Sequence, residues 1–287
     1  MNTDRLLASL DRVTPTPEAI PRLRNFILDL AVRGKLVPQD PNDEPASELL
    51  KRIAAENTRL GKASEPRGRQ PKSTVEDAAV SMTPPVGWAA TRLGTISYRI
   101  HYGFTASANA ARKDIRMLRI TDIQENAVDW PSVPGCVIGA DEIDQYKLEE
   151  GDILVARTGG TVGKTFLVRN VPVTAVFASY LIRIQAPGCL SREYLKLFME
   201  SPLYWAQLRE GTRGTGQPNV NGQTLGRLIF PLPPLAEQRR IVAKVDELMT
   251  LCDGLEASLI SVVDLRRCLL EALLARVLAP VEEIQAP

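Results

Sequence analysis

The sequence predicts an α+β fold: one mixed α/β domain, flanked by N-terminal helices and a long C-terminal coiled-coil helix. Two patterns carry this prediction. Between Trp88 and Pro233, short apolar runs alternate with turn residues, which is typical of short strands joined by loops. After Pro234, apolar residues recur in steps of four and three as far as Leu273, which is typical of a coiled-coil seam. We therefore expect four parts: a helical region at 1–60, a linker at 61–85, the mixed domain at 86–233, and a helix for spacing and dimerisation at 234–280.

The N-terminal region is expected to be helical over residues 18–60, because its apolar residues lie three or four positions apart. Gly34 and Pro38 interrupt this pattern, and a second short helix is expected from Ser47 to Leu60. The stretch from Gly61 to Pro85 is rich in Lys, Arg, Ser, Glu and Pro and holds few large apolar residues. That composition is typical of a linker.

Apolar runs in the middle of the chain predict strands and one helix. The strands are expected at Val133–Ile138, Asp152–Ala156, Thr165–Val168 and Tyr180–Ile184, and the helix at Arg192–Gln207. The prolines from Pro231 to Pro234 cannot continue a strand or lie inside a helix, so they predict a sharp boundary. Good helix formers with a carboxylate in the first turn follow at Leu235–Gln238.

The C-terminal helix is expected to run from about Leu235 to Leu278, a length of about 65 Å at 1.5 Å per residue. Its steps average 3.5 residues, so its seam needs a partner. The partner is a symmetry mate, the N-terminal helices, or both along different parts of the seam. The seam residues are Ile241, Val245, Leu248, Cys252, Leu255, Leu259 and Val262.

Composition narrows the possible functions. The chain has 287 residues, four cysteines and one histidine, and no cysteines form a CxxC pair. We therefore expect reduced, packed thiols and no metal site. The sequence has no apolar run of membrane-spanning length and no signal peptide, so we expect a soluble, cytoplasmic protein.

The net charge of +1 does not by itself indicate nucleic-acid binding, but the charges are unevenly distributed. Residues 87–119 hold six basic residues against Asp114 alone. Residues 120–152 hold nine acidic residues against Lys147, and residues 153–227 hold nine basic against three acidic. This order permits a basic face and an acidic back, although a well-mixed surface is the commoner outcome for such a composition.

Residues 151–165 contain a glycine-rich turn that ends in Gly163-Lys164-Thr165 and suggests a phosphate-binding P-loop. A P-loop needs a glycine where Thr158 stands, and it must open a helix. The following residues are β-branched and broken by Pro172, so they form a poor helix. No methyltransferase signature of Asn or Asp before Pro-Pro-aromatic occurs, and neither does the Glu-x-Lys of common nucleases. We expect no catalytic residues in this chain.

Several segments occur in an order that is similar to one known family. They are Phe26–Asp40 with Glu44–Leu50, Pro85–Trp88 with Leu93-Gly94, and Gly216–Gly222 with Phe230–Gln238 before the heptads. Together they span nearly the whole chain and resemble the specificity subunit of type I restriction-modification enzymes, which reads DNA. That subunit usually carries two target recognition domains, whereas this chain has room for one. It resembles a half-length form that is complete as a dimer.

The resemblance implies a non-catalytic subunit that recognises a bipartite DNA target, as part of a defence against foreign DNA. It implies double-stranded DNA, methyltransferase (modification) subunits and a restriction/translocase subunit as partners. S-adenosylmethionine, ATP and Mg are expected on those partner subunits, with no cofactor in this chain. The helices at 18–60 and 235–278 are the expected docking surfaces.

Three groups of residues are candidates for DNA contact: Arg99, His101, Tyr102 and Thr105; Arg157, Thr158 and Lys164; and Arg213, Gln217, Asn219 and Asn221. Arginine can bond guanine in a bidentate manner, and amides can bond adenine edges. Alternatively, the first group surrounds a core formed by Tyr98 and Phe104. The amides of the third group could instead cap backbone groups, a reading that we favour for Asn219 and Asn221.

Two functions from other classes remain open on sequence grounds. One is a P-loop-like nucleotide-binding enzyme that rests on residues 151–165. The other is a coiled-coil scaffold whose middle domain binds protein. A methyltransferase gene beside this one would separate the DNA-reading hypothesis from both.

Overall fold

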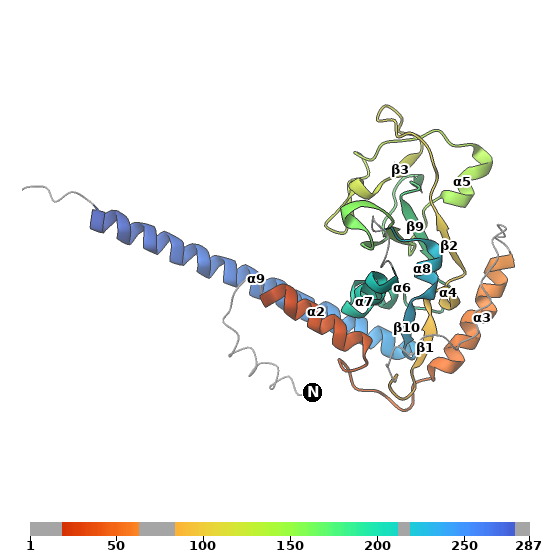
Figure 1. The fold of residues 1–287 in the computed structure, drawn as a ribbon, viewed down its shortest axis with the longest axis horizontal. Coiled ribbons are helices and arrows are strands. Elements are labelled where there is room, and N and C mark those ends of the chain that lie inside the picture. The colour runs from red at the N-terminus through yellow and green to blue at the C-terminus, as the bar shows by residue number, and fades with distance from the viewer. Residues whose placement is uncertain (1–18, 63–83, 212–218, 279–287) are drawn as a thin grey trace, which may run out of the picture. The chain divides into compact units, whose positions relative to one another are not determined.

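The computed structural model describes residues 19–62, 84–211 and 219–278 (Figure 1). They fall into two compact units. One unit runs from Leu28 to Lys244, and the other combines residues up to Ile27 with residues from Val245 onward. Helices and strands are both present, so the predicted α+β class is confirmed.

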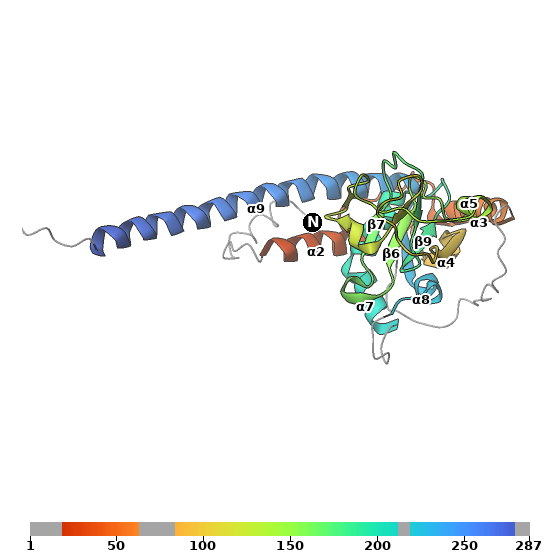
Figure 2. The same cartoon turned by 90° about the horizontal axis from the view of Figure 1, so that it is seen from above.

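The larger unit is built on a four-stranded antiparallel sheet of order β2-β9-β6-β7. Its strands are β2 (Arg99–Tyr102), β6 (Ile153–Ala156), β7 (Thr165–Leu167) and β9 (Leu181–Gln185). Every residue of β6 and β9 is buried, so these two strands form the centre of the unit. Figure 2 shows β6, β7 and β9 grouped together when the molecule is seen from above.

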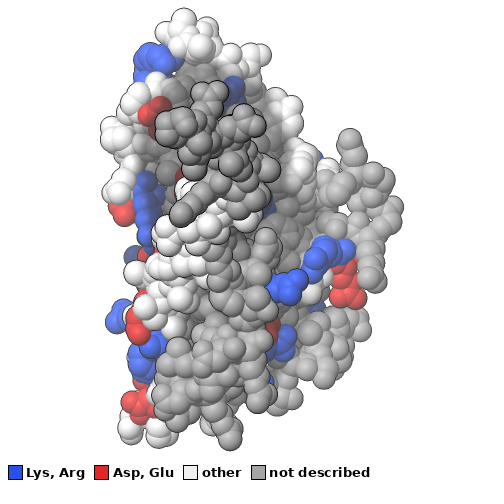
Figure 3. Space-filling view, turned by 90° about the vertical axis from the view of Figure 1, so that its left-hand side faces the viewer, with Lys and Arg blue, Asp and Glu red and all other residues white. Residues whose placement is uncertain are grey.

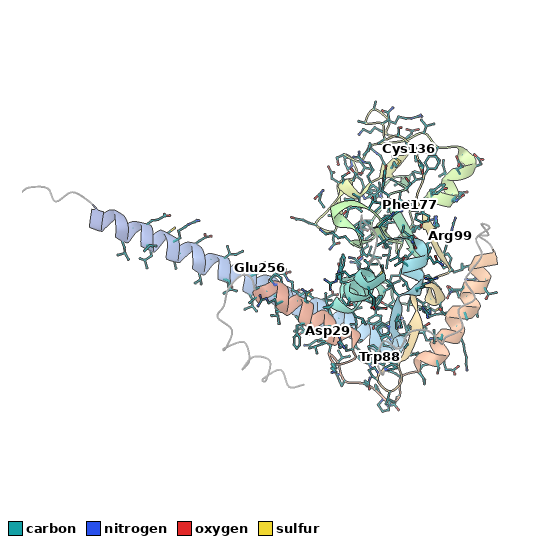
Figure 4. All side chains as sticks on the ribbon, in the orientation of Figure 1. Asp29, Trp88, Arg99, Cys136, Phe177 and Glu256 are labelled. Carbon is teal, nitrogen blue, oxygen red and sulfur yellow. The ribbon has the colours of Figure 1, made fainter. Side chains whose placement is uncertain are left out.

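Three two-stranded sheets accompany the main sheet. They pair β1 (Ala89–Arg92) with β10 (Ile229–Leu232), β3 (Arg116–Leu118) with β8 (Ala175–Phe177), and β4 (Ile123–Gln124) with β5 (Ala127–Val128). The short helices of the unit are α4 (Leu93–Ile96), α5 (Ala140–Tyr146), α6 (Arg192–Glu200), α7 (Pro202–Gly211) and α8 (Gly222–Arg227), with 3₁₀ turns η1 (Ile120–Asp122) and η2 (Gly159–Thr161). Phe177, labelled in Figure 4, is fully buried in the apolar core with Leu154 and Leu181.

Three sequence predictions need correction. Residues 133–138 form no strand, because Pro134 lacks an N–H to donate; only Gly135 makes isolated bridges, to Asn109 and Arg116. The helix predicted at 192–207 is two helices, since α6 ends at Glu200 and α7 begins at Pro202. The proline cluster does not stop the strand before it: Pro231 lies within β10, opposite Ala90. A two-stranded sheet leaves one edge of each strand unpaired, so a missing N–H is tolerated there.

Segments distant in sequence meet around Trp88, which Figure 4 labels at the start of β1. The Trp88 indole N–H donates to Glu237 Oε2 over 2.9 Å, and the ring lies edge-on to Tyr194 with centroids 6.4 Å apart. A Cβ on Gly34 would come within 3.0 Å of the Trp88 ring, so glycine is needed there for close packing. Gly34, Trp88 and Glu237, which come from three of the segments that carried the family resemblance, therefore meet in one packed junction.

Gly34 also ends α2 (Ala19–Val32), as the sequence predicted. It has φ +65°, and the N–H groups of Gly34 and Lys35 donate to Ala31 O and Leu30 O. This is a Schellman cap, in which a left-handed glycine satisfies the last carbonyls of a helix. The second N-terminal helix, α3 (Ala46–Lys62), buries Ala46, Leu49 and Ile53 along one stripe.

The C-terminal helix α9 is continuous from Leu235 to Leu278, as expected. In the smaller unit, α2 lies alongside α9 (Figures 1 and 2), and Arg24 bridges Asp253 and Glu256 over 2.6 Å each. Buried residues of this unit include Ile20, Ile27 and Cys252. Within the described ranges, no helix is both long and apolar enough to cross a membrane.

Candidate nucleic-acid interface

Arg157 lies directly after strand β6, where its backbone is fixed on both sides. Its N–H donates to Tyr180 O over 3.0 Å, and its carbonyl accepts from the N–H of Val220 over 3.1 Å. These bonds join the end of β6 to the residue before β9 and to the segment before α8. The structure thus brings Arg157 next to residues more than sixty positions away in the sequence.

The Arg157 side chain is held on an aromatic ring. Its guanidinium carbon lies 4.7 Å from the centroid of the Tyr102 ring, and its Nε donates to Asn219 Oδ1 over 3.4 Å. Within the described part of the chain, the two terminal nitrogens of Arg157 have no hydrogen-bond partner. Stacking and the Nε bond orient the planar fork while its two outer donors stay available, which suits recognition of a guanine edge or a phosphate.

Tyr102 and Asn221 complete the support of this arginine. Tyr102 is 39% exposed, and its hydroxyl oxygen accepts from the N–H of Gly222 over 3.2 Å. Asn221 is the N-cap of α8, where its side chain accepts from the N–H of Thr224 over 2.8 Å. An N-cap amide accepts from a helix N–H group that would otherwise have no partner. Asn221 therefore caps a backbone group, which is the role that the sequence analysis favoured for it. Asn219 is exposed and orients Arg157.

Tyr180 is a member of this surface that sequence reasoning missed. It was assigned to a strand, but β9 begins one residue later, and the Tyr180 side chain is 63% exposed. Because its carbonyl accepts from the N–H of Arg157, it is fixed beside that residue. An exposed tyrosine next to a basic side chain offers a stacking surface of the kind that nucleic-acid interfaces use. The pairing of β6 with β9 creates this proximity, and no local signal could have indicated it.

The glycine-rich turn after β6 joins two antiparallel strands. The N–H of Ala156 donates to Lys164 O over 2.9 Å, and β7 begins at Thr165, so no helix follows the turn. Lys164 is exposed, whereas Thr158 is half-buried and makes no side-chain cap bond to η2. This geometry lacks the helix that a P-loop opens, which disfavours the nucleotide-binding alternative.

His101 lies in a buried polar network on the opposite face of β2. Its Nε2 accepts from Arg183 Nε over 2.9 Å, and its Nδ1 lies 3.1 Å from Tyr102 O. The neutral ring with its proton on Nδ1 satisfies both bonds. Burial, together with the charges of Arg183 and Arg99, lowers the pKa of His101 to about 3. Both ring nitrogens are thus engaged inside the protein.

Arg183 is the centre of that network and is 2% exposed. It donates to Asp152 Oδ2 over 3.0 Å, to Gln145 O over 2.8 Å and to Lys147 O. Asp152 in turn accepts from Gln185 Nε2 and from the N–H of Glu149. The network fastens β2, β6 and β9 to the segment around α5, so it stabilises the sheet that carries Arg157.

Arg99 does not share a face with Arg157. Side chains alternate along a strand, so Arg99 points with His101, while Ile100 and Tyr102 point toward Gly222. Burial, with the nearby charge of Arg183, lowers the pKa of Arg99, and its Nε is buried without a partner among the described residues. Figure 4 labels Arg99 on β2. The structure therefore places Arg99 and Arg157, candidates from two different groups, on opposite faces of the sheet.

The other candidates for DNA contact are Thr105, Arg213 and Gln217. Thr105 is exposed, just past the bridge of Phe104 to Ala178. Arg213 and Gln217 lie outside the described residues. On the face drawn in Figure 3, the lysine and arginine side chains that are shown lie among aspartates and glutamates, so charge is mixed there.

The predicted seam of α9 is largely buried as far as Cys252 and more exposed beyond it. Ile241, Val245 and Cys252 are buried within the chain, and Leu248 and Leu259 are half-buried. Leu255 and Val262 are 44% and 45% exposed. Further exposed apolar residues follow on the same helix, namely Leu265, Leu269, Leu270 and Leu273.

The family model of the type I restriction modification DNA specificity domain matches residues 85–264. The chain therefore belongs to the type I restriction-modification DNA specificity domain family, and the curated relatives that it matches are named specificity subunits.

Two curated relatives come from Escherichia coli. The chain is 31% identical to the type I restriction enzyme EcoAI specificity subunit, over 89% of this chain and 44% of that protein. It is 29% identical to the EcoEI specificity subunit, over 95% of this chain and 47% of that protein. The chain thus spans less than half the length of these relatives.

A solved structure is similar in fold. It is a chain from a study of complex assembly and conformational transition of the type I R-M system. The TM-score is 0.51 at 18% identity, over 92% of this chain and 56% of that chain. This likeness supports the arrangement of helices and sheets.

Proposed function

We propose that this chain is the DNA sequence-specificity subunit of a type I restriction-modification complex, and that Arg157 is its principal reading residue. The observation that carries the proposal is the geometry of Arg157: its backbone is bonded on both sides, its guanidinium lies on Tyr102, and its terminal nitrogens are unbonded within the described chain. A fork fixed in this way loses little freedom when it bonds a base edge. Family membership supports DNA as the ligand.

We propose a guanine edge as the partner of Arg157. A bidentate contact to guanine O6 and N7 needs two parallel donors in one plane, which the stacked guanidinium offers. The Asn219 bond occupies Nε, so the two terminal nitrogens form the available pair. The Tyr102 ring lies under this guanidinium, Tyr180 is an exposed aromatic residue bonded to the Arg157 backbone, and Thr105, Thr158 and Lys164 are further candidates for DNA contact.

We further propose that two copies act together on a bipartite, palindromic target with an unread gap. The proposed dimer contact is formed by the exposed apolar residues of α9 from Leu255 to Leu273, whereas Ile241, Val245 and Cys252 of the seam are buried within the chain. Two copies related by a twofold axis would present two readers to symmetric half-sites.

The catalytic work belongs to partners in this proposal. Methyltransferase subunits bring S-adenosylmethionine, and a restriction/translocase subunit brings ATP and Mg. The helices α2, α3 and α9 are the proposed docking surfaces, and the cytoplasm is the expected location. The solved structure with a similar fold concerns complex assembly of a type I R-M system, which supports such partners.

Methylome sequencing tests the proposal in cells with and without the gene. One bipartite methylation motif should be present in the parent strain and absent from the deletion strain. A plasmid-borne copy should restore it, which controls for effects on neighbouring genes. Identical methylation in the two strains, with the methyltransferase subunit expressed, would contradict the proposed function.

A further inference from the structure

Gly159 and Gly160 lie at the tip of the β6–β7 turn, and the backbone conformation favours glycine only at position 159. Gly159 has φ +79°, a left-handed conformation that a side chain would strain. Gly160 does not have positive φ, and a Cβ built on it meets no atom within 4 Å. Both residues are exposed. Nothing in the described fold requires a glycine at position 160.

The turn is flanked by cations. Arg157 stands at its start and Lys164 at its end, and residues 157–164 hold no acidic side chain. The two ends are held together, because the N–H groups of Ala156 and Gly163 donate to Lys164 O and Ala156 O over 2.9 Å. In the described structure, the N–H groups of Gly159 and Gly160 have no acceptor. The turn therefore combines two basic side chains, open backbone donors and an absence of bulk.

We propose that this turn is a contact site for the DNA backbone, with a phosphate against Gly159 and Gly160 between Arg157 and Lys164. The inference rests on the proposed function and specifies how the DNA approaches. Backbone N–H groups and lysines are common phosphate donors, and a side chain at 160 would stand where the strand passes. Arg157 would then read a base next to a phosphate that the turn holds, which fixes the register of reading.

The test separates fold from binding by substituting Gly160. Gly160→Ala and Gly160→Leu should unfold at the parent's urea midpoint or above it, since the site is open and the backbone is compatible. In complex with the methyltransferase subunits, Gly160→Leu should weaken binding to cognate and scrambled duplexes equally and lower the salt slope by about one unit. Gly188→Leu is the matched control, because Gly188 lies outside the proposed docking helices, is also exposed, has φ that is not positive, and a Cβ built on it would meet only Glu56 Oε1, at 3.6 Å. It should leave the salt slope unchanged.

Lys164→Gln supplies an independent variant of the same site. It should show the same loss of salt slope, and the double variant with Gly160→Leu should lose less than the sum of the two, because both remove one contact. Parent-like affinity and slope for Gly160→Leu and Lys164→Gln, with a parent that binds its cognate duplex, would overturn the inference and leave the proposed function intact. A parent that does not bind would overturn both. ATP or inorganic phosphate is also added as a competitor of the duplex, with added salt of the same ionic strength as the control. Competition at concentrations at which the control has no effect would point to a nucleotide site and overturn the DNA assignment.

Discussion

The buried pair of Arg183 and Asp152 gives the sharpest stability prediction. Their side chains are 2% and 5% exposed, and Arg183 Nη1 lies 3.0 Å from Asp152 Oδ2. Asp152→Asn keeps the shape and most of the acceptors but removes the charge, so a buried guanidinium is left without a counterion. Breaking such a pair costs about 3–5 kcal/mol. We expect about 3 kcal/mol, because three other acceptors remain on Arg183, namely His101 Nε2, Gln145 O and Lys147 O.

Urea denaturation followed by tryptophan fluorescence measures this effect. All three tryptophans, Trp88, Trp130 and Trp205, lie in the unit from Leu28 to Lys244, so the signal reports that unit alone. The expected loss corresponds to a fall in Tm of roughly 6–12 °C, at about 2–4 °C for each kcal/mol in a unit of this size. The m-value should stay constant.

Arg183→Met provides the second arm of a double-mutant cycle. The double variant Arg183→Met/Asp152→Asn should be more stable than the two single losses predict, because it leaves no charge unpaired. An Asp152→Asn variant within 0.5 kcal/mol of the parent would refute the reasoning, as would strict additivity in the cycle.

Three further predictions follow from the structure. The pKa of His101 is lowered from 6.5 to about 3 in the folded protein, so the unfolded chain takes up the proton first as pH falls. The free energy of unfolding should therefore fall by about 1.4 kcal/mol for each pH unit below 6.5 in the parent but not in His101→Gln. Urea midpoints of the parent and of His101→Gln that change in parallel between pH 6.5 and 4.5 would exclude this. Burial raises the pKa of Glu237 above its ordinary value of 4.5, so ionisation opposes folding above that pH. Glu237→Gln keeps an acceptor for Trp88 and should gain stability relative to the parent as pH rises from 4 to 8, and a constant difference across that range would count against it. Leu255→Glu with Val262→Glu should give a folded monomer in analytical ultracentrifugation, because both residues are exposed in the single chain; an unchanged mass would place the dimer contact elsewhere.

Helix α9 and strands β6, β7 and β9 could be predicted because their signals are local in the sequence. The α9 pattern repeats over many turns, and β6, β7 and β9 are compact apolar runs. Strand β2 was missed because Arg99-Ile100-His101-Tyr102 has no clear apolar alternation; its pairing with β9, more than eighty residues away, forms it. Apolar content alone misled at Val133–Ile138, where proline removes a donor.

The candidate site could be predicted only in parts. Arg157, Tyr102 and Asn219 were each selected from local composition, but their mutual contact depends on β6, β2 and the segment before α8 coming together. His101 was selected as a polar residue in a basic cluster, whereas Arg183, which holds it, is an arginine inside a buried strand and gave no local signal. Contacts between distant strands decide which basic residues face outward, and a single sequence does not encode them locally.

Binding by Arg157 variants tests the central claim most directly. Arg157→Lys and Arg157→Ala, in complex with the methyltransferase subunits, are titrated with the methylome-defined duplex and with a scrambled one over a salt series. Reading of guanine predicts that both variants lose roughly 1–3 kcal/mol on the cognate duplex and little on the scrambled duplex, because lysine cannot reproduce the planar fork. Parent-like affinity of both variants on the cognate duplex would contradict the account and place the reading surface away from Arg157.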